Sequence, residues 1–349
     1  KSDKFNSAIS RRDFITTGSL AGAGVLMSPS LRAGEKLVAG GGRRKRVAHV
    51  GTGSRSRFFR GAIVGDYAPY AEYVGLCDNN PGRLKLFQKA VQDATGVLAP
   101  AYDAVDFDRM VAETKPDVVI VTTVDSTHAQ YIIRAMELGC DVITEKPMTT
   151  DAAMCQAIID TQKNTGQTCT VGFNYRYSPF RAQVKDLLMS GAIGEVLSVD
   201  FHWMLNTHHG ADYFRRWHSE KQFSGGLMVH KATHHFDLVN WWLSAVPETV
   251  YANGKREFYT PSMVKRFGLN GAHERCRTCP EKNRCGFYLD LAKRQSLKEL
   301  YLDNEHHDGY FRDRCVFRNG IDIEDTMNVV VEYDSKATMS YSLNAFNSW

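Results

Sequence analysis

Several features are missing from this chain of 349 residues, and each absence excludes a class of structure or function. No internal repeat or low-complexity tract is present, and beyond the N-terminal region no apolar run approaches the roughly 20 residues of a membrane span. The main body also lacks excess positive charge. Residues 1–46 hold ten basic and three acidic side chains, which leaves −3 on the rest of the chain. Because a nucleic-acid footprint needs a basic face on the folded part, we expect no nucleic-acid partner.

The N-terminal segment has the pattern of an export signal. Ser10-Arg11-Arg12-Asp13-Phe14-Ile15 precedes a mild apolar run over 16–27, and small residues follow near residue 33. Twin arginines before a weakly hydrophobic segment resemble a Tat signal, the export route for folded proteins. We therefore assign 1–42 to a Tat-like signal and linker. We expect the Tat machinery as a partner and a periplasmic or otherwise exported location, with an uncleaved N-terminal tether as one variant. A frayed basic helix is the alternative.

Residues 43–175 alternate short apolar strands with amphipathic helices, which predicts a doubly wound parallel sheet of the Rossmann type, an α/β fold. The expected strands cover 47–50, 73–77, 118–121, 141–144 and 169–173, and the expected helices cover 56–64, 82–93, 127–138 and 151–164.

Residues 176–349 have a different pattern, which predicts an α+β domain with an open, mainly antiparallel sheet. Helices are expected at 178–189 and 226–243, and strands at 196–203, 325–333 and 336–343, the last two joined by a hairpin at Asp334-Ser335. A polar, cysteine-bearing insertion covers about 254–320. The chain starts without Met and stops at Trp349 just after a strand, so we expect a fragment with a truncated C-terminus.

A glycine-rich turn follows the first strand directly and opens a helix: Gly51-Thr52-Gly53-Ser54-Arg55-Ser56. This arrangement suits a dinucleotide pyrophosphate, although a simple turn is the alternative. Asp78 ends the second strand, where a carboxylate accepts ribose hydroxyls and repels a 2′-phosphate. Asn79-Asn80 supply no neighbouring arginine, so we predict NAD(H) rather than NADP(H), with Ser54, Arg55 and Asn79 also lining the site.

The tripeptide Glu145-Lys146-Pro147 follows the fifth strand. With the glycine turn, Asp125-Ser126-Thr127-His128, Asn174-Tyr175-Arg176-Tyr177 and Gly225-Gly226…His234-His235-Phe236-Asp237, it resembles the glucose–fructose oxidoreductase / inositol dehydrogenase (Gfo/Idh/MocA) family over about residues 46–245. The resemblance implies an NAD-dependent oxidoreductase acting on CH–OH groups of carbohydrates.

The resemblance also assigns residues to the site. It implies that Lys146 and His234 flank the nicotinamide and the substrate, with His234 as proton acceptor and Lys146 stabilising the alkoxide. It adds Thr123, His128 and Glu145 to the cofactor site, and Tyr175 and Arg176 to the substrate site. The loop over 206–223 carries aromatic and polar side chains that suit a sugar, Trp217 among them, and His235 joins the substrate candidates.

One departure from the family concerns His230, which stands where many relatives carry Asp, four residues before the catalytic His. At i and i+4, His230 and His234 share a helical face, so His230 is a candidate substrate contact. A metal site of His230, His234 and Asp237 and purely structural histidines are the alternatives.

The eight cysteines divide into two groups. Cys77, Cys140, Cys155 and Cys169 are expected as buried thiols. Cys276, Cys279, Cys285 and Cys315 fall in the polar insertion and suggest a staple: a structural zinc site or two disulfides, with an iron–sulfur cluster or unlinked thiols as further alternatives.

Three functions remain open on the sequence. Outside the cytoplasm no free NAD recharges an enzyme, which favours tightly bound NAD and a redox-closed reaction on a secondary hydroxyl of a sugar, glycoside or polyol. The alternatives are an NAD-dependent glycosidase working by transient oxidation, elimination and re-reduction, and a non-catalytic sugar- or nucleotide-binding protein. A homo-oligomer is expected, because open sheet faces commonly bury against a partner.

Overall fold

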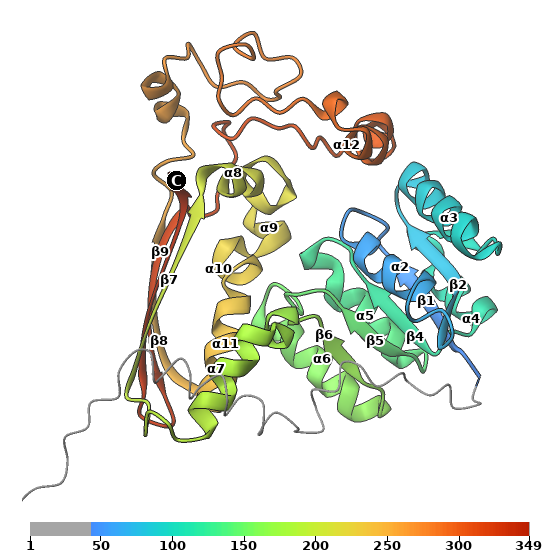
Figure 1. Cartoon of the computed structure of the whole chain (residues 1–349). Coiled ribbons are helices and arrows are strands. Elements are labelled where there is room, and N and C mark those ends of the chain that lie inside the picture. The colour runs from blue at the N-terminus through green and yellow to red at the C-terminus, as the bar shows by residue number, and fades with distance from the viewer. Residues whose placement is uncertain (1–42, 349) are drawn as a thin grey trace, which may run out of the picture. The chain divides into compact units, whose positions relative to one another are not determined.

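The computed structural model describes residues 43–348 (Figure 1). The Tat-like signal and linker predicted for 1–42 therefore lie outside the described residues. Six parallel strands form the first sheet in the order β3-β2-β1-β4-β5-β6. Their bounds are β1 Lys45–Val50, β2 Ala71–Asp78, β3 Ala101–Asp103, β4 Val118–Val121, β5 Asp141–Thr144 and β6 Cys169–Val171. This is the predicted Rossmann sheet. The direction in which successive strands are added to the sheet reverses between β1 and β4.

Helices cover both faces of this sheet: α2 Ser56–Val64, α3 Pro81–Thr95, α4 Phe107–Thr114, α5 His128–Glu137 and α6 Ala152–Thr165. Successive strand residues point to opposite faces, so Val47 joins one core and Ala48 the other. Phe87 of α3 packs in the first core, and Ile132 of α5 in the second. Burial on both faces explains why the strands are almost continuously apolar.

The second sheet has four strands in the order β7-β10-β9-β8, with bounds β7 Ser198–Asn206, β8 Pro247–Lys255, β9 Thr326–Tyr333 and β10 Thr338–Asn347. β10 pairs with β7 in parallel and with β9 antiparallel, and β9 pairs with β8 antiparallel. The predicted open, mainly antiparallel sheet is confirmed, as is the hairpin between β9 and β10.

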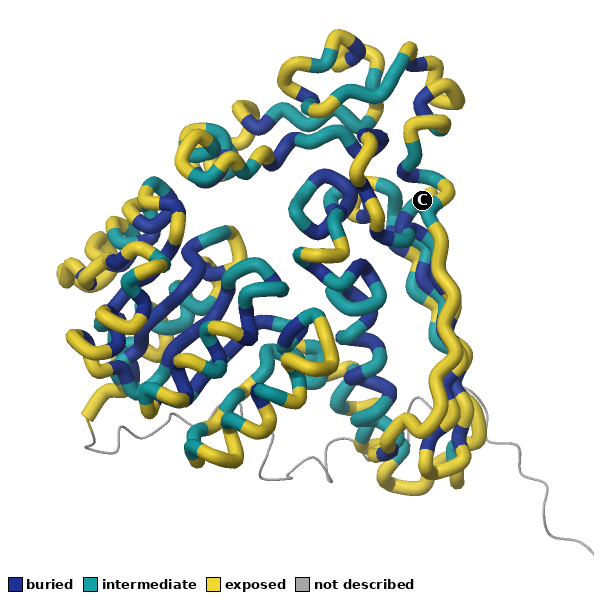
Figure 2. The backbone as a smooth tube through the Cα atoms, turned by 180° about the vertical axis from the view of Figure 1, so that it is seen from behind, coloured by how far each residue is buried: buried dark blue, intermediate teal, exposed yellow. Residues whose placement is uncertain are grey.

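One face of this sheet carries the core of the second domain. Alternate residues of β9 and β10, among them Val329 and Leu343, pack against Phe214, Leu227 and Val239 of the covering helices. β8 is exposed along its whole length (Figure 2). The predicted homo-oligomer stays a prediction.

Two predicted segments of this domain are wrong in detail. The expected helix 226–243 is two helices, α10 Gly226–His230 and α11 Thr233–Leu243, separated at Lys231 and Ala232. The expected loop 206–223 is mostly helical: α8 Thr207–Arg215, a 3₁₀ turn η5 Trp217–Ser219 and α9 Lys221–Ser224. Asn206 caps α8 by accepting a hydrogen bond from the His209 N–H, which starts a helix that the polar composition concealed.

The remaining elements are short. They comprise the 3₁₀ turns η2 Ala104–Asp106, η3 Asp125–Thr127, η4 Asn174–Tyr177, η6 Pro261–Phe267, η7 Leu291–Lys293 and η8 Leu302–Asn304, with helices α7 Pro179–Met189, α12 Gln295–Leu300 and α13 Glu305–Asp308. The insertion expected at about 254–320 starts within the last residues of β8 and contains α12 and α13. Within residues 43–348, no helix has the length and apolar character of a membrane span.

Candidate active site

The glycine turn after β1 has the backbone that a dinucleotide requires. Gly51 has φ +88°, and a Cβ there would lie 2.7 Å from backbone atoms of Thr122 and Thr123, so only glycine fits. A Cβ on Gly53 would meet nothing within 4 Å, which leaves open space directly before α2. Free N–H groups at the start of this helix can then face a pyrophosphate.

Asp78 anchors this turn from the end of β2. Its Oδ2 accepts hydrogen bonds from Thr52 N (2.5 Å) and Thr52 Oγ1 (2.8 Å), and Oδ1 accepts one from Asn80 N (2.7 Å). The expectation that no arginine lies near Asp78 is wrong, because Arg83 Nη2 is 3.9 Å from Asp78 Oδ1. The first turn of α3 brings this residue back beside the strand end, which the sequence of 79–80 alone does not reveal.

Two residues predicted for the cofactor site pair with each other. Arg55 Nε donates to Glu145 Oε1 at 2.5 Å, and its guanidinium lies 4.9 Å from the centre of the Phe58 ring. Ser54 and Asn79 are exposed at the ends of β1 and β2. The ion pair connects the glycine turn to the loop after β5.

His128 and Thr123 connect two loops rather than facing open space. The buried His128 ring places Nδ1 2.8 Å from the Pro147 carbonyl oxygen and Nε2 3.3 Å from that of Thr123. Thr123 Oγ1 also accepts a hydrogen bond from Thr127 Oγ1 at 2.9 Å. Burial lowers the pKa of His128 to about 4, so the ring is neutral and acts as a brace under the loop that carries Lys146.

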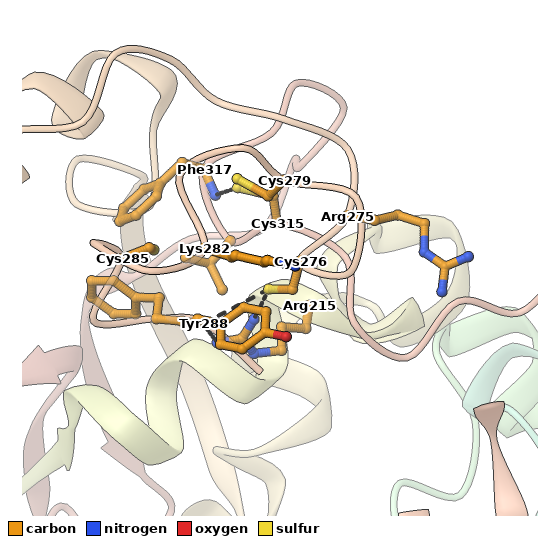
Figure 3. Close-up of a pocket in the computed structure, with 11 residues that line it drawn as sticks. Arg215, Arg275, Cys276, Cys279, Lys282, Cys285, Tyr288, Cys315 and Phe317 are labelled. Atoms are coloured by element: carbon orange, nitrogen blue, oxygen red, sulfur yellow. Dashed lines mark hydrogen bonds between the residues drawn. The ribbon is translucent and has the colours of Figure 1, made fainter. Parts of the chain in front are cut away.

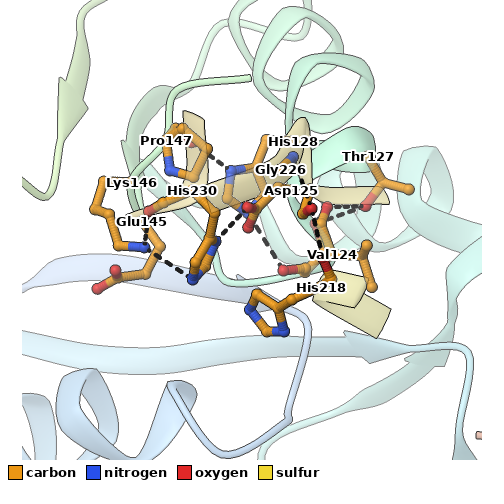
Figure 4. Close-up of polar contacts among 12 residues, drawn as sticks. Val124, Asp125, Thr127, His128, Glu145, Lys146, Pro147, His218, Gly226 and His230 are labelled. Atoms are coloured by element: carbon orange, nitrogen blue, oxygen red, sulfur yellow. Dashed lines mark hydrogen bonds and ion pairs between the residues drawn. The ribbon is translucent and has the colours of Figure 1, made fainter. Parts of the chain in front are cut away.

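Lys146 points to the second domain and meets His230 (Figure 4). Its Nζ lies 3.2 Å from His230 Nε2 and donates to the His230 carbonyl oxygen at 2.8 Å. On the other side of the same ring, Nδ1 lies 2.5 Å from Asp125 Oδ2. Since the lysine donates to Nε2, the imidazole proton belongs on Nδ1, where it is donated to the carboxylate.

Burial acts against the charged form of each group in the row Asp125, His230 and Lys146, while the charges of Asp125 and Lys146 favour each other. It raises the pKa of Asp125 well above its usual range, with Lys146 acting in the opposite direction. It lowers the pKa of His230, as does the charge of Lys146. It also lowers the pKa of Lys146 to about 8, although Asp125 counteracts this. A lysine with that pKa has an appreciable neutral fraction near pH 7 and can accept a proton.

His234 lies on Tyr175 beside this row. The two rings stack at 4.0 Å between centroids and 5° between planes, and Lys231 Nζ donates to the Tyr175 hydroxyl at 3.0 Å. His234 Nδ1 is buried without a hydrogen-bond partner. Burial, then the charges of Lys146 and Lys231, lower the pKa of His234 to about 2. His234 is thus a neutral hydrogen-bonding group, and an orphaned buried nitrogen suits a ligand atom.

The other residues predicted for the substrate site, Arg176, Trp217 and His235, lie in three different surroundings. Arg176 forms a two-pronged ion pair with Asp237, with Nε donating to Oδ2 at 2.8 Å, which holds η4 to α11. Trp217 stacks on His218 with its ring centre 5.8 Å from that of His230, beside the row. His235 is fully buried, with Nδ1 2.8 Å from the Tyr341 hydroxyl, so it belongs to the core against the second sheet, not to the crevice.

The metal interpretations find no support in the structure. Asp237 is committed to Arg176, and the break between α10 and α11 removes the expected i and i+4 face of His230 and His234. Within 43–348, no group of three or more His, Cys, Asp or Glu side chains is placed to hold a metal ion.

The four cysteines of the insertion nevertheless lie around the same pocket. Cys276, Cys279, Cys285 and Cys315 line one small pocket together with Arg215 and Lys282 (Figure 3). Arg215 Nη1 lies 3.3 Å from Cys276 Sγ. All eight cysteines are free thiols, so the expected staple forms neither as disulfides nor as a metal-ligand group among the described residues. The other four cysteines lie in the first domain as expected, with Cys77 and Cys140 buried and Cys155 and Cys169 partly buried.

Sequence reasoning assigns no individual role to three members of the site: Asp125, His218 and Lys231. Asp125 belongs to a family-like stretch directly after β4, at the carboxyl edge of a parallel sheet where ligands bind. That position was an available signal. His218, packed 4.1 Å from His230 ring to ring, lies in the segment 206–223 that the sequence already proposes for sugar binding. Lys231, buried beside Tyr175, gives no signal, because only the fold brings it there.

Comparisons with known proteins agree with this geometry. Residues 45–173 match the model "Oxidoreductase family, NAD-binding Rossmann fold" of Gfo/Idh/MocA, and residues 185–349 match its "C-terminal alpha/beta domain". A Bacillus subtilis (strain 168) protein named "Putative oxidoreductase YteT" is 38% identical over 307 residues, or 86% of this chain and 71% of that one. An inositol 2-dehydrogenase/D-chiro-inositol 3-dehydrogenase from Lactiplantibacillus plantarum is 28% identical over 171 residues, or 49% of this chain and 44% of that one.

Among solved structures, the fold is similar to that of a WlbA dehydrogenase from Chromobacterium violaceum in complex with NADH and UDP-GlcNAcA. The TM-score is 0.62 at 22% identity, and the match covers 88% of this chain and 68% of that one. The glycine turn, the row at Lys146 and both domain matches lead to one assignment. The chain belongs to the Gfo/Idh/MocA family of NAD-binding oxidoreductases.

Proposed function

We propose that the protein is an NAD-dependent dehydrogenase that oxidises a secondary hydroxyl of a sugar, glycoside or polyol, with Lys146 as the proton acceptor. The observation that carries this proposal is the row Lys146–His230–Asp125, which presents a partly buried lysine of lowered pKa beside the orphaned nitrogen of His234. Perturbed titratable groups gathered at the end of a parallel sheet are typical of catalytic sites.

The residues present fit NAD. The open space at Gly53 and the start of α2 would take the pyrophosphate, and Asp78 the adenosine ribose. When bound, the nicotinamide supplies the acceptor for the hydride that leaves the carbinol carbon.

Lys146 has the chemistry for the other half of the reaction. As the C–H hydride leaves the substrate, the hydroxyl proton must move to a base, and neutral Lys146 Nζ can take it to become an ammonium. The ammonium remains hydrogen-bonded to His230, whose tautomer is fixed by Asp125. A base with a pKa near 8 is better matched to neutral pH than one near 2, so the roles assigned from the resemblance are exchanged: Lys146 accepts the proton and His234 hydrogen-bonds the substrate oxygen.

The substrate class follows from the side chains around the row. Tyr175 and Trp217 offer aromatic faces, and His230, His234 and Lys231 offer polar groups at their edges. A sugar or polyol has apolar C–H faces and a hydroxyl rim that such a site can bind. The relatives named as inositol dehydrogenases support a cyclic polyol or pyranose.

We further propose, from the twin-arginine pattern at residues 11–12, that the protein is exported already carrying its NAD and regenerates it in place. Denaturing the purified protein and identifying the released nucleotide and its redox state tests this idea. We expect about one NAD(H) per chain. Protein that is purified empty and stays inside the cytoplasm would contradict it.

The reaction itself is tested by adding inositols, free sugars and glycosides to the NAD-bound protein and following NADH absorbance. We expect reduction with one class of secondary alcohol and its loss in K146M. Release of aglycone without accumulation of ketosugar would select the glycosidase alternative instead. A cofactor whose absorbance never changes would favour a binding protein.

A further inference from the structure

The cysteine-bearing insertion reaches the adenosine side of the cofactor site. Asn80 Nδ2 donates to the Asn304 carbonyl oxygen at 2.9 Å, and Arg83 forms an ion pair with Asp308. A Cβ on Gly82 would lie 1.6 Å from Asn304 Oδ1, so the insertion packs directly on the first turn of α3. Residues more than 220 positions apart thus meet beside Asp78, where α12 approaches α3 (Figure 1).

Arg83 is the centre of this contact. Only 8% of the residue is exposed, Nη2 pairs with Asp308 and lies 3.9 Å from Asp78, and Nη1 has no hydrogen-bond partner. The guanidinium therefore lies between two carboxylates, one from the Rossmann domain and one from the insertion. Its remaining donor is buried and unused.

Arg83 is also one of the residues that line a cavity of about 210 Å³. Arg57 and Arg60 of α2 line it together with Arg83, and so do Thr52 and Ser56, whose hydroxyls donate to Asp78 Oδ2 and to the Gly53 carbonyl oxygen. Glu299 of the insertion supplies the only carboxylate among the residues that line it. Three arginines around one space form a pattern that binds a phosphate monoester.

The location of this cavity indicates which phosphate group it would bind. Asp78 would bind the adenosine ribose, so a group beside both Asp78 and Arg83 would lie near the 2′ position. NADP carries a phosphate there and NAD a hydroxyl. The site thus contains both an acidic residue that favours NAD and a cationic pocket that would accept NADP.

We propose that Asp308 determines the dinucleotide specificity of this enzyme by pairing with Arg83 and withholding its charge from a 2′-phosphate. The inference rests on the proposed binding of NAD at the glycine turn. Asp308 and Asp78 together neutralise Arg83 and repel a phosphate dianion, whereas a ribose hydroxyl is unaffected by the pair. A residue of the insertion, outside the Rossmann domain, thereby controls a property of that domain.

The test measures binding of NADH and NADPH, by fluorescence titration or calorimetry, to nucleotide-free full-length protein. For D308N we expect the Kd ratio of NADPH to NADH to fall by about tenfold or more, since an uncompensated Arg83 attracts the phosphate. The matched control is D303N, which removes an exposed carboxylate of the same segment, paired with Lys298 and not with Arg83. We expect its ratio to remain at the wild-type value.

A double variant separates the proposal from a loosened insertion. In R83M/D308N the gain for NADPH should disappear, because the attracting group is gone. An equal loss of affinity for both nucleotides in D308N, retained in the double variant, would mean that Asp308 only supports the fold and would overturn the proposal. An unchanged ratio in D308N would also overturn it. Since no alcohol substrate is used, a failed substrate screen leaves this result intact, and failure to bind either nucleotide would refute the cofactor site itself.

Discussion

Asp125 Oδ2 and His230 Nδ1 lie 2.5 Å apart, although the aspartate follows β4 of the Rossmann domain and the histidine ends α10 of the second domain. The family resemblance implies an aspartate at the position of this histidine. The carboxylate is thus supplied from the opposite domain, and the imidazole lies between it and Lys146.

This relationship predicts the effect of D125N on pH dependence. Lys146 must be neutral to accept a proton, so the rate of alcohol oxidation should fall as pH decreases below about 8 and level off above it. The charge of Asp125 raises the pKa of Lys146, so its removal should move this limb to lower pH. Stopped-flow NADH formation across pH gives the midpoint. A lower rate with an unmoved midpoint would show that Asp125 only supports the structure.

Substitutions of the two catalytic candidates, Lys146 and His234, should slow hydride transfer to different extents. K146M removes the proton acceptor and should slow hydride transfer by about 10²-fold or more. H234N keeps a neutral hydrogen-bonding group and should lose much less, about tenfold, since His234 does not take the proton. Single-turnover reduction of the bound nucleotide distinguishes them. A greater loss in H234N would return the role of base to the histidine.

Arg176 and Asp237 should act together in stability. R176M leaves the buried Asp237 unpaired and should lower the free energy of unfolding by about 1–2 kcal/mol, less than for a fully buried pair because Arg176 is partly exposed. Denaturant unfolding measures this. The double variant R176M/D237N should recover part of the loss. Unchanged stability with a strongly raised KM would identify Arg176 as a substrate contact.

The cysteines of the insertion allow a direct chemical test. The structure predicts eight free thiols in protein denatured without reductant, and slow reaction of the native protein, because burial raises the pKa of Cys276, Cys279 and Cys285. A thiol titration with metal analysis measures both quantities. Four thiols would restore the two disulfides, and one zinc released with four protected thiols would restore the metal site.

How far the sequence predicts the fold depends on the length of each pattern. The apolar strands β1, β4 and β5 and the helix α2 are predicted almost to the residue, since burial on both sheet faces leaves long local signals. β3 and α4 are absent from the prediction because a strand of three residues and a helix of eight are short patterns, easily read as part of a loop. The sequence predicts a loop at 206–223, where the structure has helices. The helix α8 depends on its cap and on packing against the sheet, which local composition does not reveal.

The sequence by itself determined the family and the glycine turn, and it predicted Asp78, Lys146 and His234 for the site, because these depend on short motifs tied to neighbouring strands and helices. Only the tertiary structure decided which residues meet: Lys146 with His230 and Asp125, Arg176 with Asp237, and Arg83 with Asp308. The direct contacts Lys146–His230, Asp125–His230, Arg176–Asp237 and Arg83–Asp308 each join residues 61 or more positions apart. The physical reason is that the charge and hydrogen-bonding state of a buried group are set by its neighbours in space, which no local pattern encodes.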